Sequence, residues 1–310
     1  MAEEASPPVP QGLELVRILS NDPEGKAAVV LCTAPRPGEP AADAIVMLAK
    51  KPWSDADVQS IVEGKGTQLS EFHRNDKFSK YHAQPPAPMN EVAITFICPA
   101  NEIDITKYTR QRRHVVRETP EIYATATAPF VSELPASQLA WVQAIMDRQA
   151  EMDRLLYEDS GAMMVPDTKW DLKDPETLYT LAIFKDRDIK SVRDLRGCHI
   201  EMLKTLRAGA LAELKERYGV SPSSLRVYMH YLPSFWWGHV HFASLTCPAM
   251  SVTTSVGKAI LLDDIIDNLQ RDPEHYQNTS LTMVVGEGEP LFTHLCKAGA
   301  MDIENKYGKN

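Results

Sequence analysis

Two short apolar segments in the second half of the chain restrict the fold most strongly. LRVYMHYL, residues 225–232, and HVHFASL, residues 239–245, are rich in β-branched and aromatic residues, and PSFWWG joins them. Two such runs around a short connection predict a β-hairpin, and therefore an antiparallel sheet. Because side chains two positions apart share one face of a strand, Trp237, His239 and His241 are predicted to point to the same side.

Two imidazoles on one face of a strand allow more than one interpretation. An isolated His-x-His pattern fits a pair of hydrogen-bonded core histidines or half of a metal site. A metal site would also need a carboxylate or a third histidine, and Asp263–Asp264 is the acidic pair close by in sequence. That pair is explained more simply as the polar face of a helix.

Helical periodicity alternates with strand patterns through the second half. Ser137 is a plausible N-cap for a helix whose apolar stripe runs toward Leu156. Helices are also predicted from about His199 to Tyr218, with Gly219 as the C′ residue, and from Val256 to Leu269, and a strand is predicted in SLTMVV. Antiparallel strands with helices packed on one side predict the α+β class.

The first hundred residues have a different pattern. LELVRIL, KAAVVLCT, AIVMLAK and EVAITFICP are short apolar runs separated by turn residues, and they predict a β-rich domain with one helix at Asp55–Glu63. The composition changes at KYTRQRRHVVRETPEIY, residues 107–123, whose charge we attribute to a solvated helix face. We therefore predict a disordered tail at residues 1–11, a smaller N-terminal domain at 12–115 and a C-terminal domain at 116–310.

The charge balance and the cysteines narrow the function classes. With 33 Lys and Arg against 42 Asp and Glu, the net charge is −9, which argues against coating long nucleic acid but allows a small anionic ligand. The five cysteines form no Cys-x-x-Cys pair, which indicates a reducing compartment and no thiolate zinc site. Without a long apolar segment or a signal sequence, we expect no membrane partner and a cytoplasmic location, with the nucleus as a second compartment.

One motif resembles that of a known superfamily. Pro233-Ser234, followed by His239-Val240-His241-Phe242, resembles the His-φ-His-φ-His-φ-φ signature of histidine-triad hydrolases, in which φ is an apolar residue. The segments RVYMHYLPSFWWGHVHFASL, FKDRDIKSVRDL, DPEHYQNTSLTM and VPDTKW are similar to those of the scavenger mRNA-decapping branch of that superfamily. The resemblance extends from Leu13 to about Gly299. It implies a C-terminal histidine-triad sheet with packed helices, preceded by an N-terminal domain exchanged within a homodimer.

The resemblance also assigns the catalytic histidines. His239 stands at the position of the nucleophile that attacks the phosphate next to the methylated nucleoside, and His241 is the third member of the triad. Trp237 replaces the first histidine, which helps to hold the tautomer and orientation of the nucleophile. Because losing an orienting group usually lowers the rate without abolishing the chemistry, we expect activity to persist. The implied mechanism requires no cofactor and no metal.

The remaining positions implied by the resemblance divide into three groups. His230, Ser234 and Lys258 fall on phosphate-contacting positions, where positive charge and hydroxyl donors stabilise phosphoryl oxygens. A second group would form the 7-methylguanine pocket, with Trp141 stacking on the charged base and Glu151 accepting from the guanine edge: Trp141, Glu151, Pro166, Asp167 and Lys169. Asn75 would reach the ligand from the N-terminal domain, which acts as a lid.

Without the resemblance, these residues have ordinary interpretations. Trp141 would be a core aromatic, Glu151 part of a solvated helix face, and Asn75-Asp76 a turn signal. Lys258 would be an exposed lysine at a helix start and Ser234 a turn serine. On one straight helix Trp141 and Glu151 would lie roughly 15 Å apart, a gap that a base and two side chains could just span.

The leading hypothesis is hydrolysis of the cap dinucleotide m7GpppN and of short capped RNA left by 3′-to-5′ mRNA decay. The products would be m7GMP and a nucleoside or oligonucleotide diphosphate, formed through a covalent histidine intermediate. Trp237 motivates an alternative, a cap-binding or regulatory protein with weakened catalysis. A third hypothesis is a histidine-triad hydrolase of dinucleoside polyphosphates, which would make no use of Trp141 and Glu151.

Overall fold

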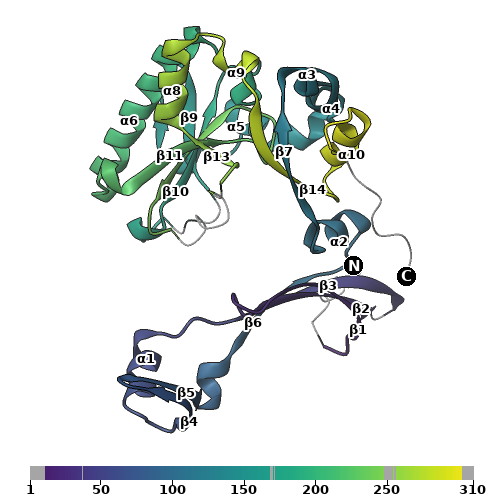
Figure 1. Ribbon diagram of the computed structural model, residues 1–310, viewed down its shortest axis with the longest axis vertical. Coiled ribbons are helices and arrows are strands. Elements are labelled where there is room, and N and C mark those ends of the chain that lie inside the picture. Colours follow the sequence, from purple (N-terminus) through teal and green to yellow (C-terminus); the bar gives the residue numbers. More distant parts are fainter. Residues whose placement is uncertain are drawn as a thin grey trace, which may run out of the picture. The chain divides into compact units, whose positions relative to one another are not determined.

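The computed structural model describes residues 11–36, 38–167, 170, 172–247, 254 and 256–301 of the chain. The chain divides into two compact units, residues 1–111 and 112–310. Each unit contains antiparallel sheets with helices, so the protein has a mixed α and β fold with two domains (Figure 1). The first ten residues of the predicted tail lie outside the described residues.

The N-terminal unit is built on a four-stranded antiparallel sheet in the order β1-β2-β3-β6. The predicted strands and the predicted helix are confirmed. A separate hairpin, β4-β5, and three helical segments complete the unit. The elements are β1 Glu14–Asp22, β2 Ala27–Arg36, β3 Glu39–Lys50, α1 Asp55–Val62, β4 Gln68–Asn75, β5 Phe78–Gln84, the 3-10 helix η1 Ala87–Asn90, β6 Val92–Ile97 and α2 Glu102–Tyr108.

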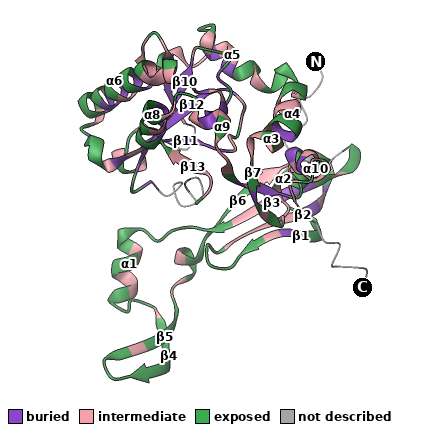
Figure 2. Ribbon diagram, turned by 45° about the horizontal axis from the view of Figure 1, so that its top comes forward, coloured by how far each residue is buried: buried purple, intermediate pink, exposed green. Residues whose placement is uncertain are grey.

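The four-stranded sheet buries only a small core. Leu19, Leu31 and Ile45 pack against Ile105 of α2. The hairpin β4-β5 is exposed along almost its whole length, as Figure 2 shows in green. Several large apolar side chains of the unit are also exposed in the single chain: Leu15, Val16, Ile18, Trp53, Leu69, Phe72, Phe78, Val92 and Ile94.

The C-terminal unit contains a six-stranded antiparallel sheet in the order β13-β11-β12-β10-β9-β8. The predicted hairpin is confirmed, because β11 and β12 pair antiparallel around the loop 231–238. Short apolar strands on both sides of this hairpin extend the sheet. Its strands are β8 Tyr157–Glu158, β9 Ala162–Pro166, β10 Tyr179–Phe184, β11 Leu225–His230, β12 His239–Ser244 and β13 Ala259–Leu261.

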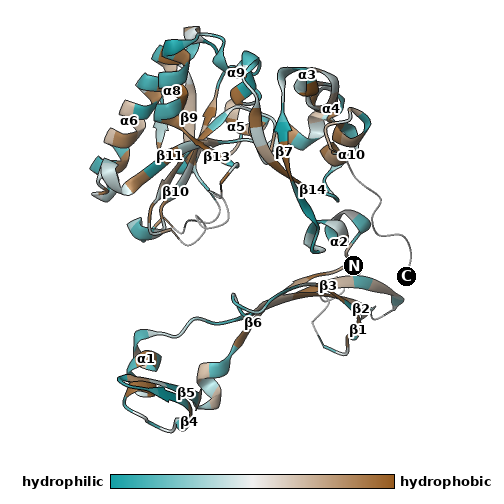
Figure 3. Ribbon diagram, in the orientation of Figure 1, coloured by the Kyte–Doolittle hydropathy of each residue, from teal (hydrophilic) through white to brown (hydrophobic). Residues whose placement is uncertain are grey.

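Helices cover this sheet unequally. On one face, α6, Ile200–Tyr218, and α8, Leu262–Arg271, pack over side chains that include Val240 and Phe242. Both helices turn apolar residues to the sheet and polar ones to solvent (Figure 3). On the other face lies the short helix α5, Ala140–Met146. The helix predicted at about 199–218 is confirmed, and Gly219 ends it in the left-handed region at φ 68°.

A second, two-stranded sheet pairs β7, Arg113–Glu118, with β14, Leu281–Gly286. The strand expected in SLTMVV is therefore confirmed. The helix face expected within 107–123 is wrong over β7, because pairing with β14 keeps these residues extended and buries alternate side chains, Val116 and Glu118. Helical segments surround this sheet: α3 Pro120–Ile122, the π-helix η2 Tyr123–Thr127, α4 Ala128–Glu133, α9 His275–Asn278 and α10 Pro290–Lys297.

Two predicted helices have different bounds in the structure. The long helix expected from Ser137 to Leu156 is broken: a 3-10 turn, η3 Ala136–Leu139, precedes α5, and the chain leaves the helix after Met146. Residues 157–158 pair with β9, so the chain has to turn back toward the sheet. The helix expected from Val256 starts only at Leu262, because residues 259–261 pair with β11.

Short 3-10 helices connect the remaining elements of the C-terminal unit. They are η4 Met152–Arg154, η5 Pro175–Thr177, η6 Val192–Asp194, η7 Gly197–His199 and η8 Pro222–Ser224. Among the described residues, no helix has the length and apolar character needed to cross a membrane.

Gly209 in α6 provides a test of the packing between this helix and the sheet edge. A Cβ at Gly209 would lie only 2.5 Å from Cζ of Tyr157, whose hydroxyl donates to Asp159 at 2.9 Å. We expect Gly209→Ala to lower the free energy of unfolding by about 1–3 kcal/mol through this overpacking, although alanine favours helix by ~1 kcal/mol. Chemical denaturation measures the change.

The exposed neighbour Ala208 supplies the control for helix propensity. Ala208→Gly should cost no more than about 1 kcal/mol, since no packing is lost there. A Gly209→Ala protein more stable than the wild type would contradict the packing argument.

Candidate active site

The strand register places the two histidines of the motif on the face opposite α6 and α8. His239 is paired with Ile183 and His241 with Leu181 on β10, and His241 is paired with Tyr228 on β11. Directly paired residues of antiparallel strands project from the same face. The predicted common orientation of His239 and His241 is therefore confirmed, and both side chains are buried.

His230, at the end of β11, joins the pair to form a cluster of three imidazoles. Its ring centroid lies 4.3 Å from that of His241, which lies 4.9 Å from that of His239. One nitrogen of each ring lies within 4.8 Å of the others, so in the described part of the chain these three residues could supply ligands to a metal ion. A tetrahedral zinc site needs nitrogens roughly 3.3 Å apart, so the rings would have to move together to hold one.

The tautomer of His239 follows from its hydrogen bond. Nδ1 lies 2.6 Å from the carbonyl oxygen of Trp237, and since a carbonyl can only accept, Nδ1 carries the proton. Nε2 then has the lone pair, and among the described residues it is buried without a hydrogen-bond partner. Burial lowers the pKa of His239 to about 4, although the bond to Trp237 and the charge of Asp167 act in the opposite direction. At neutral pH His239 is an uncharged imidazole with an available nitrogen, the form required of a nucleophile.

Trp237 acts on His239 through its backbone. Its indole Nε1 donates to the carbonyl of Phe184 at 2.7 Å, and the ring packs in a buried cluster with Val142 and Ile145 of α5. The Trp237 side chain, at the position of the first histidine, thus holds the start of β12 in place. The backbone carbonyl of the same residue fixes the tautomer of His239.

Gly238, directly before β12, lets the backbone there approach the backbone of Ile189 and Phe184 closely. Its N–H donates to the carbonyl of Ile189 at 2.7 Å, and its own carbonyl accepts from Phe184 N at 2.9 Å. A Cβ at this position would lie 2.7 Å from the Ile189 oxygen. The histidine-triad signature has an apolar residue here, so glycine is a second departure, and it keeps the Trp237 carbonyl in place.

A cavity of about 450 Å³ opens beside the histidines. Four of the residues predicted to bind the base lie in its wall: Trp141, Glu151, Pro166 and Asp167. The other lining residues come from the same helix, turn and strands: Ile145, Ala150, Arg154, Val165, Leu181 and Phe235. Apolar walls with a few polar groups are typical of a site for a small organic ligand.

The break after α5 brings Trp141 and Glu151 to one cavity. Trp141 lies on α5 and is 44% exposed. Glu151 adopts the left-handed conformation at φ 61°, and its Oε2 accepts from Arg154 Nη1 at 2.7 Å. The roughly 15 Å separation expected on one helix therefore does not apply. A turn after α5 brings Glu151 to the cavity instead, and the ion pair with Arg154 orients the Glu151 carboxylate.

Phe235 connects the cavity to His239. Its ring stacks on the His239 ring with centroids 4.0 Å apart and an interplanar angle of 12°, and its edge meets Trp141 at 4.9 Å. Neither Phe235 nor Arg154 was predicted from the sequence as a site residue. The aromatic run of PSFWWG, directly before the histidine motif, is a signal that could have indicated Phe235. Phe235 thus links the wall of the cavity to the imidazole cluster.

Of the residues predicted to contact phosphate, His230 belongs to the imidazole cluster. His230 precedes Tyr231, whose backbone N–H donates to the carbonyl of Lys258 at 2.7 Å. Ser234 is exposed in the loop between β11 and β12.

Two predicted site residues lie outside the described part of the C-terminal unit. Asn75 belongs to the N-terminal unit, where it ends β4 beside Asp76, which has φ 48°, so the turn reading of this pair is confirmed. Lys169 lies outside the described residues. The functional roles of all the predicted site residues stay predictions.

Comparisons with known proteins agree with this geometry. Residues 11–111 match the family model "Scavenger mRNA decapping enzyme (DcpS) N-terminal", and residues 140–257 match "Scavenger mRNA decapping enzyme C-term binding". The chain is 36% identical to an m7GpppX diphosphatase of Caenorhabditis elegans over 94% of its own length and 92% of the relative. It is 40% identical to the Bos taurus and 36% identical to the Homo sapiens m7GpppX diphosphatase, each over 83% of this chain and 76% of the relative. The chain belongs to the scavenger mRNA decapping enzyme family.

The protonation state of His239 can be measured directly. In protein labelled with ¹⁵N-histidine, we expect the His239 Nε2 signal of an unprotonated acceptor at neutral pH, with protonation only as the pH falls toward about 4. In urea the same residue should titrate at about 6.5. Because the unfolded chain then binds the proton more tightly, the free energy of unfolding should fall as the pH drops through this window. A proton on Nε2 at pH 7, or a folded-state pKa near 6.5, would contradict the assignment.

Proposed function

We propose that the protein hydrolyses the cap dinucleotide m7GpppN and short capped oligoribonucleotides, releasing m7GMP and a nucleoside or oligonucleotide 5′-diphosphate. The observation that carries this proposal is the link made by Phe235, which lines the cavity that holds Trp141 and Glu151 and stacks on His239. A base in the cavity would lie next to the Phe235 ring that packs on His239. The relatives, named m7GpppX diphosphatases, support the same chemistry.

The cavity suits a positively charged purine. Methylation at N7 gives guanine a formal positive charge, and the half-exposed ring of Trp141 can stack on it with an added cation–π attraction. The carboxylate of Glu151, oriented by Arg154, can accept from the two donors on the guanine edge. Unmethylated guanine lacks the charge, so this pocket favours the methylated base.

The reaction would proceed in two displacements. His239 Nε2 attacks the phosphorus next to the methylated nucleoside, so that an N–P bond forms, the bridging P–O bond breaks and the diphosphate leaves. Water then attacks the same phosphorus, the N–P bond breaks, and m7GMP is released with the water proton passing to solvent. His230, Ser234 and Lys258 would stabilise the charge on the phosphoryl oxygens. Neither step calls for a metal ion or an organic cofactor.

The contact between Trp237 and His239 argues against the alternative, a cap-binding protein with weakened catalysis. The first histidine would help to orient the nucleophile, and in this chain the Trp237 carbonyl performs that orientation at 2.6 Å from His239 Nδ1. The hydrogen bond that fixes the tautomer is thus present without the missing imidazole. This favours a working hydrolase over a binding protein.

The exposed apolar residues of the N-terminal unit support a homodimer. Leu15 and Ile18 on β1, and Val92 and Ile94 on β6, expose apolar side chains at the two edge strands of the four-stranded sheet in the single chain. Exposed apolar surface often marks an interaction site. In the proposed dimer the N-terminal domains are exchanged, and Asn75 reaches the ligand of the other protomer.

The net charge of −9 limits the substrate length. Such a surface offers a long RNA little nonspecific attraction, so the affinity should fall as the RNA body lengthens. A cytoplasmic location, with the nucleus as a second compartment, is part of the proposal, and the five cysteines are all free, as expected in a reducing compartment.

Hydrolysis of m7GpppG in the presence of EDTA tests the proposal. We expect the wild type to release m7GMP and GDP, and His239→Asn to lose at least about a thousandfold in kcat because it lacks the nucleophile. Trp237→His should bind m7GpppG as the wild type does. Products are separated by chromatography.

Three results would contradict the proposal. Intact m7GpppG recovered from a tight wild-type complex would favour the cap-binding alternative, above all if Trp237→His then released m7GMP. Full activity in His239→Asn would exclude the assigned nucleophile. Faster turnover of ApppA than of m7GpppG would favour a dinucleoside polyphosphate hydrolase.

Selectivity for the methylated base should depend on Trp141. In the inactive His239→Asn background, Trp141→Ala should weaken m7GpppG binding by about 1–3 kcal/mol, and GpppG binding by less, because only the methylated base carries the charge. Titration calorimetry measures both affinities.

Trp236→Ala is the matched control, since Trp236 lies in the neighbouring loop and contacts Phe130. Equal losses for m7GpppG and GpppG in Trp141→Ala, or an equal loss of m7GpppG affinity in Trp236→Ala, would contradict the role of Trp141.

A further inference from the structure

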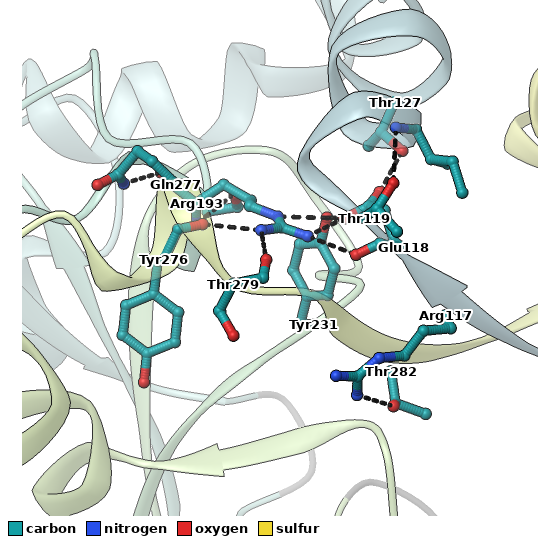
Figure 4. Close-up of polar contacts among 12 residues, drawn as sticks. Arg117, Glu118, Thr119, Thr127, Arg193, Tyr231, Tyr276, Gln277, Thr279 and Thr282 are labelled. Atoms are coloured by element: carbon teal, nitrogen blue, oxygen red, sulfur yellow. Dashed lines mark hydrogen bonds and ion pairs between the residues drawn. The ribbon is translucent and has the colours of Figure 1, made fainter.

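A buried ion pair joins Glu118 and Arg193 in the C-terminal unit (Figure 4). Glu118, the last residue of β7, accepts from Arg193 of η6 through Nε at 3.1 Å and Nη2 at 2.8 Å. Their side chains are 0% and 1% exposed. Thr127 donates to the other carboxylate oxygen at 2.5 Å, and the hydroxyl of Tyr231 donates to the oxygen that Arg193 also contacts.

The arginine is fully engaged. Besides the two bonds to the carboxylate, Arg193 donates to the backbone carbonyls of Glu118, Tyr276 and Thr279 at 3.0, 2.8 and 2.6 Å. These bonds use all five N–H groups of the guanidinium. Its position is therefore fixed by two separate segments, the end of β7 and the α9 segment, and it fixes the Glu118 carboxylate in turn.

Tyr231 connects this ion pair to the site. Burial and the negative charge of Glu118 raise the pKa of Tyr231, so its hydroxyl stays protonated and remains a donor. Its backbone N–H donates to the carbonyl of Lys258 at 2.7 Å, and it directly follows His230 in the chain. Tyr231 thus joins the buried carboxylate to two of the three predicted phosphate contacts. His230 ends β11, and Lys258 directly precedes the neighbouring strand β13.

Tyr231 also begins the loop that carries Ser234 and Phe235 to the nucleophile. A shift of its ring would be transmitted along the chain in both directions, to His230 and to this loop. Phenylalanine at this position would fill the same space, so the hydroxyl is needed for its bond to Glu118 and not for packing.

We propose that Tyr231 and Glu118 are positioning residues for phosphoryl transfer: the Glu118–Arg193 ion pair, through the Tyr231 hydroxyl, holds His230 and Lys258 in register with His239. This inference rests on the function proposed above. Neither residue touches the substrate. The base pocket, formed by α5 and the turn that follows it, is outside their reach.

The test compares Tyr231→Phe with Tyr276→Phe. Tyr276 is also buried in the same unit, and its hydroxyl accepts from Asn268 at 3.2 Å, away from the predicted phosphate contacts. For each variant, kcat and KM for m7GpppG, the affinities for 7-methylguanosine and m7GDP, and the Tm are measured. The nucleoside reports the base pocket alone, and the diphosphate adds the phosphate side.

We expect Tyr231→Phe to lower kcat about tenfold and to weaken m7GDP binding several-fold, while the affinity for 7-methylguanosine changes less than twofold. Tyr276→Phe should lower the Tm without either effect. Glu118→Gln should show the same selective loss of phosphate affinity in any fraction that folds.

A Tyr231→Phe enzyme with kcat and m7GDP affinity within twofold of the wild type would overturn the inference. An equal loss of kcat in Tyr276→Phe would also overturn it, because the effect would then follow general stability. If the wild type binds m7GDP but leaves m7GpppG intact, only the proposed hydrolysis is contradicted. The affinities for m7GDP and 7-methylguanosine then still test the positioning role.

Discussion

The site depends on the register of β12 between its two neighbours. His239 and His241 are paired with Ile183 and Leu181 of β10, and Tyr228 of β11 is paired with His241. A slip of one residue would turn both imidazoles toward α6 and α8 and bring Val240 and Phe242 to the site. The apolar packing of Val240 and Phe242 under those helices opposes such a slip. The same burial that stabilises the sheet therefore selects the face on which the chemistry takes place.

Burial then determines the protonation state of His239, the proposed nucleophile. Removing His239 from water disfavours its charged form, and the Trp237 carbonyl directs the remaining proton to Nδ1. In the proposed mechanism the departure from the histidine-triad signature at Trp237 is tolerated, because the group that orients His239 belongs to the backbone. Gly238 and the indole bond to Phe184 keep that backbone against its neighbours.

The features predicted correctly from the sequence are those that local hydrophobic periodicity determines. The hairpin around residues 231–238, the helix that ends at Gly219 and the shared face of His239 and His241 all follow from such patterns. Pairing between distant segments overrode them elsewhere: β8 breaks the long helix before Leu156, and β14 makes a strand of residues 113–118. Within the site, Trp141 and Glu151 were predicted by resemblance, whereas the stacking of Phe235 and the pair of Glu118 with Arg193 join segments whose proximity no local pattern encodes.

The stereochemical course at phosphorus tests most directly whether His239 acts as a covalent nucleophile. A cap dinucleotide with a chiral phosphorothioate next to the 7-methylguanosine is hydrolysed in H₂¹⁸O, and the configuration of the released nucleotide is determined. Two successive displacements, first by His239 Nε2 and then by water, predict overall retention of configuration. Inversion would show a single displacement by water and would contradict the account.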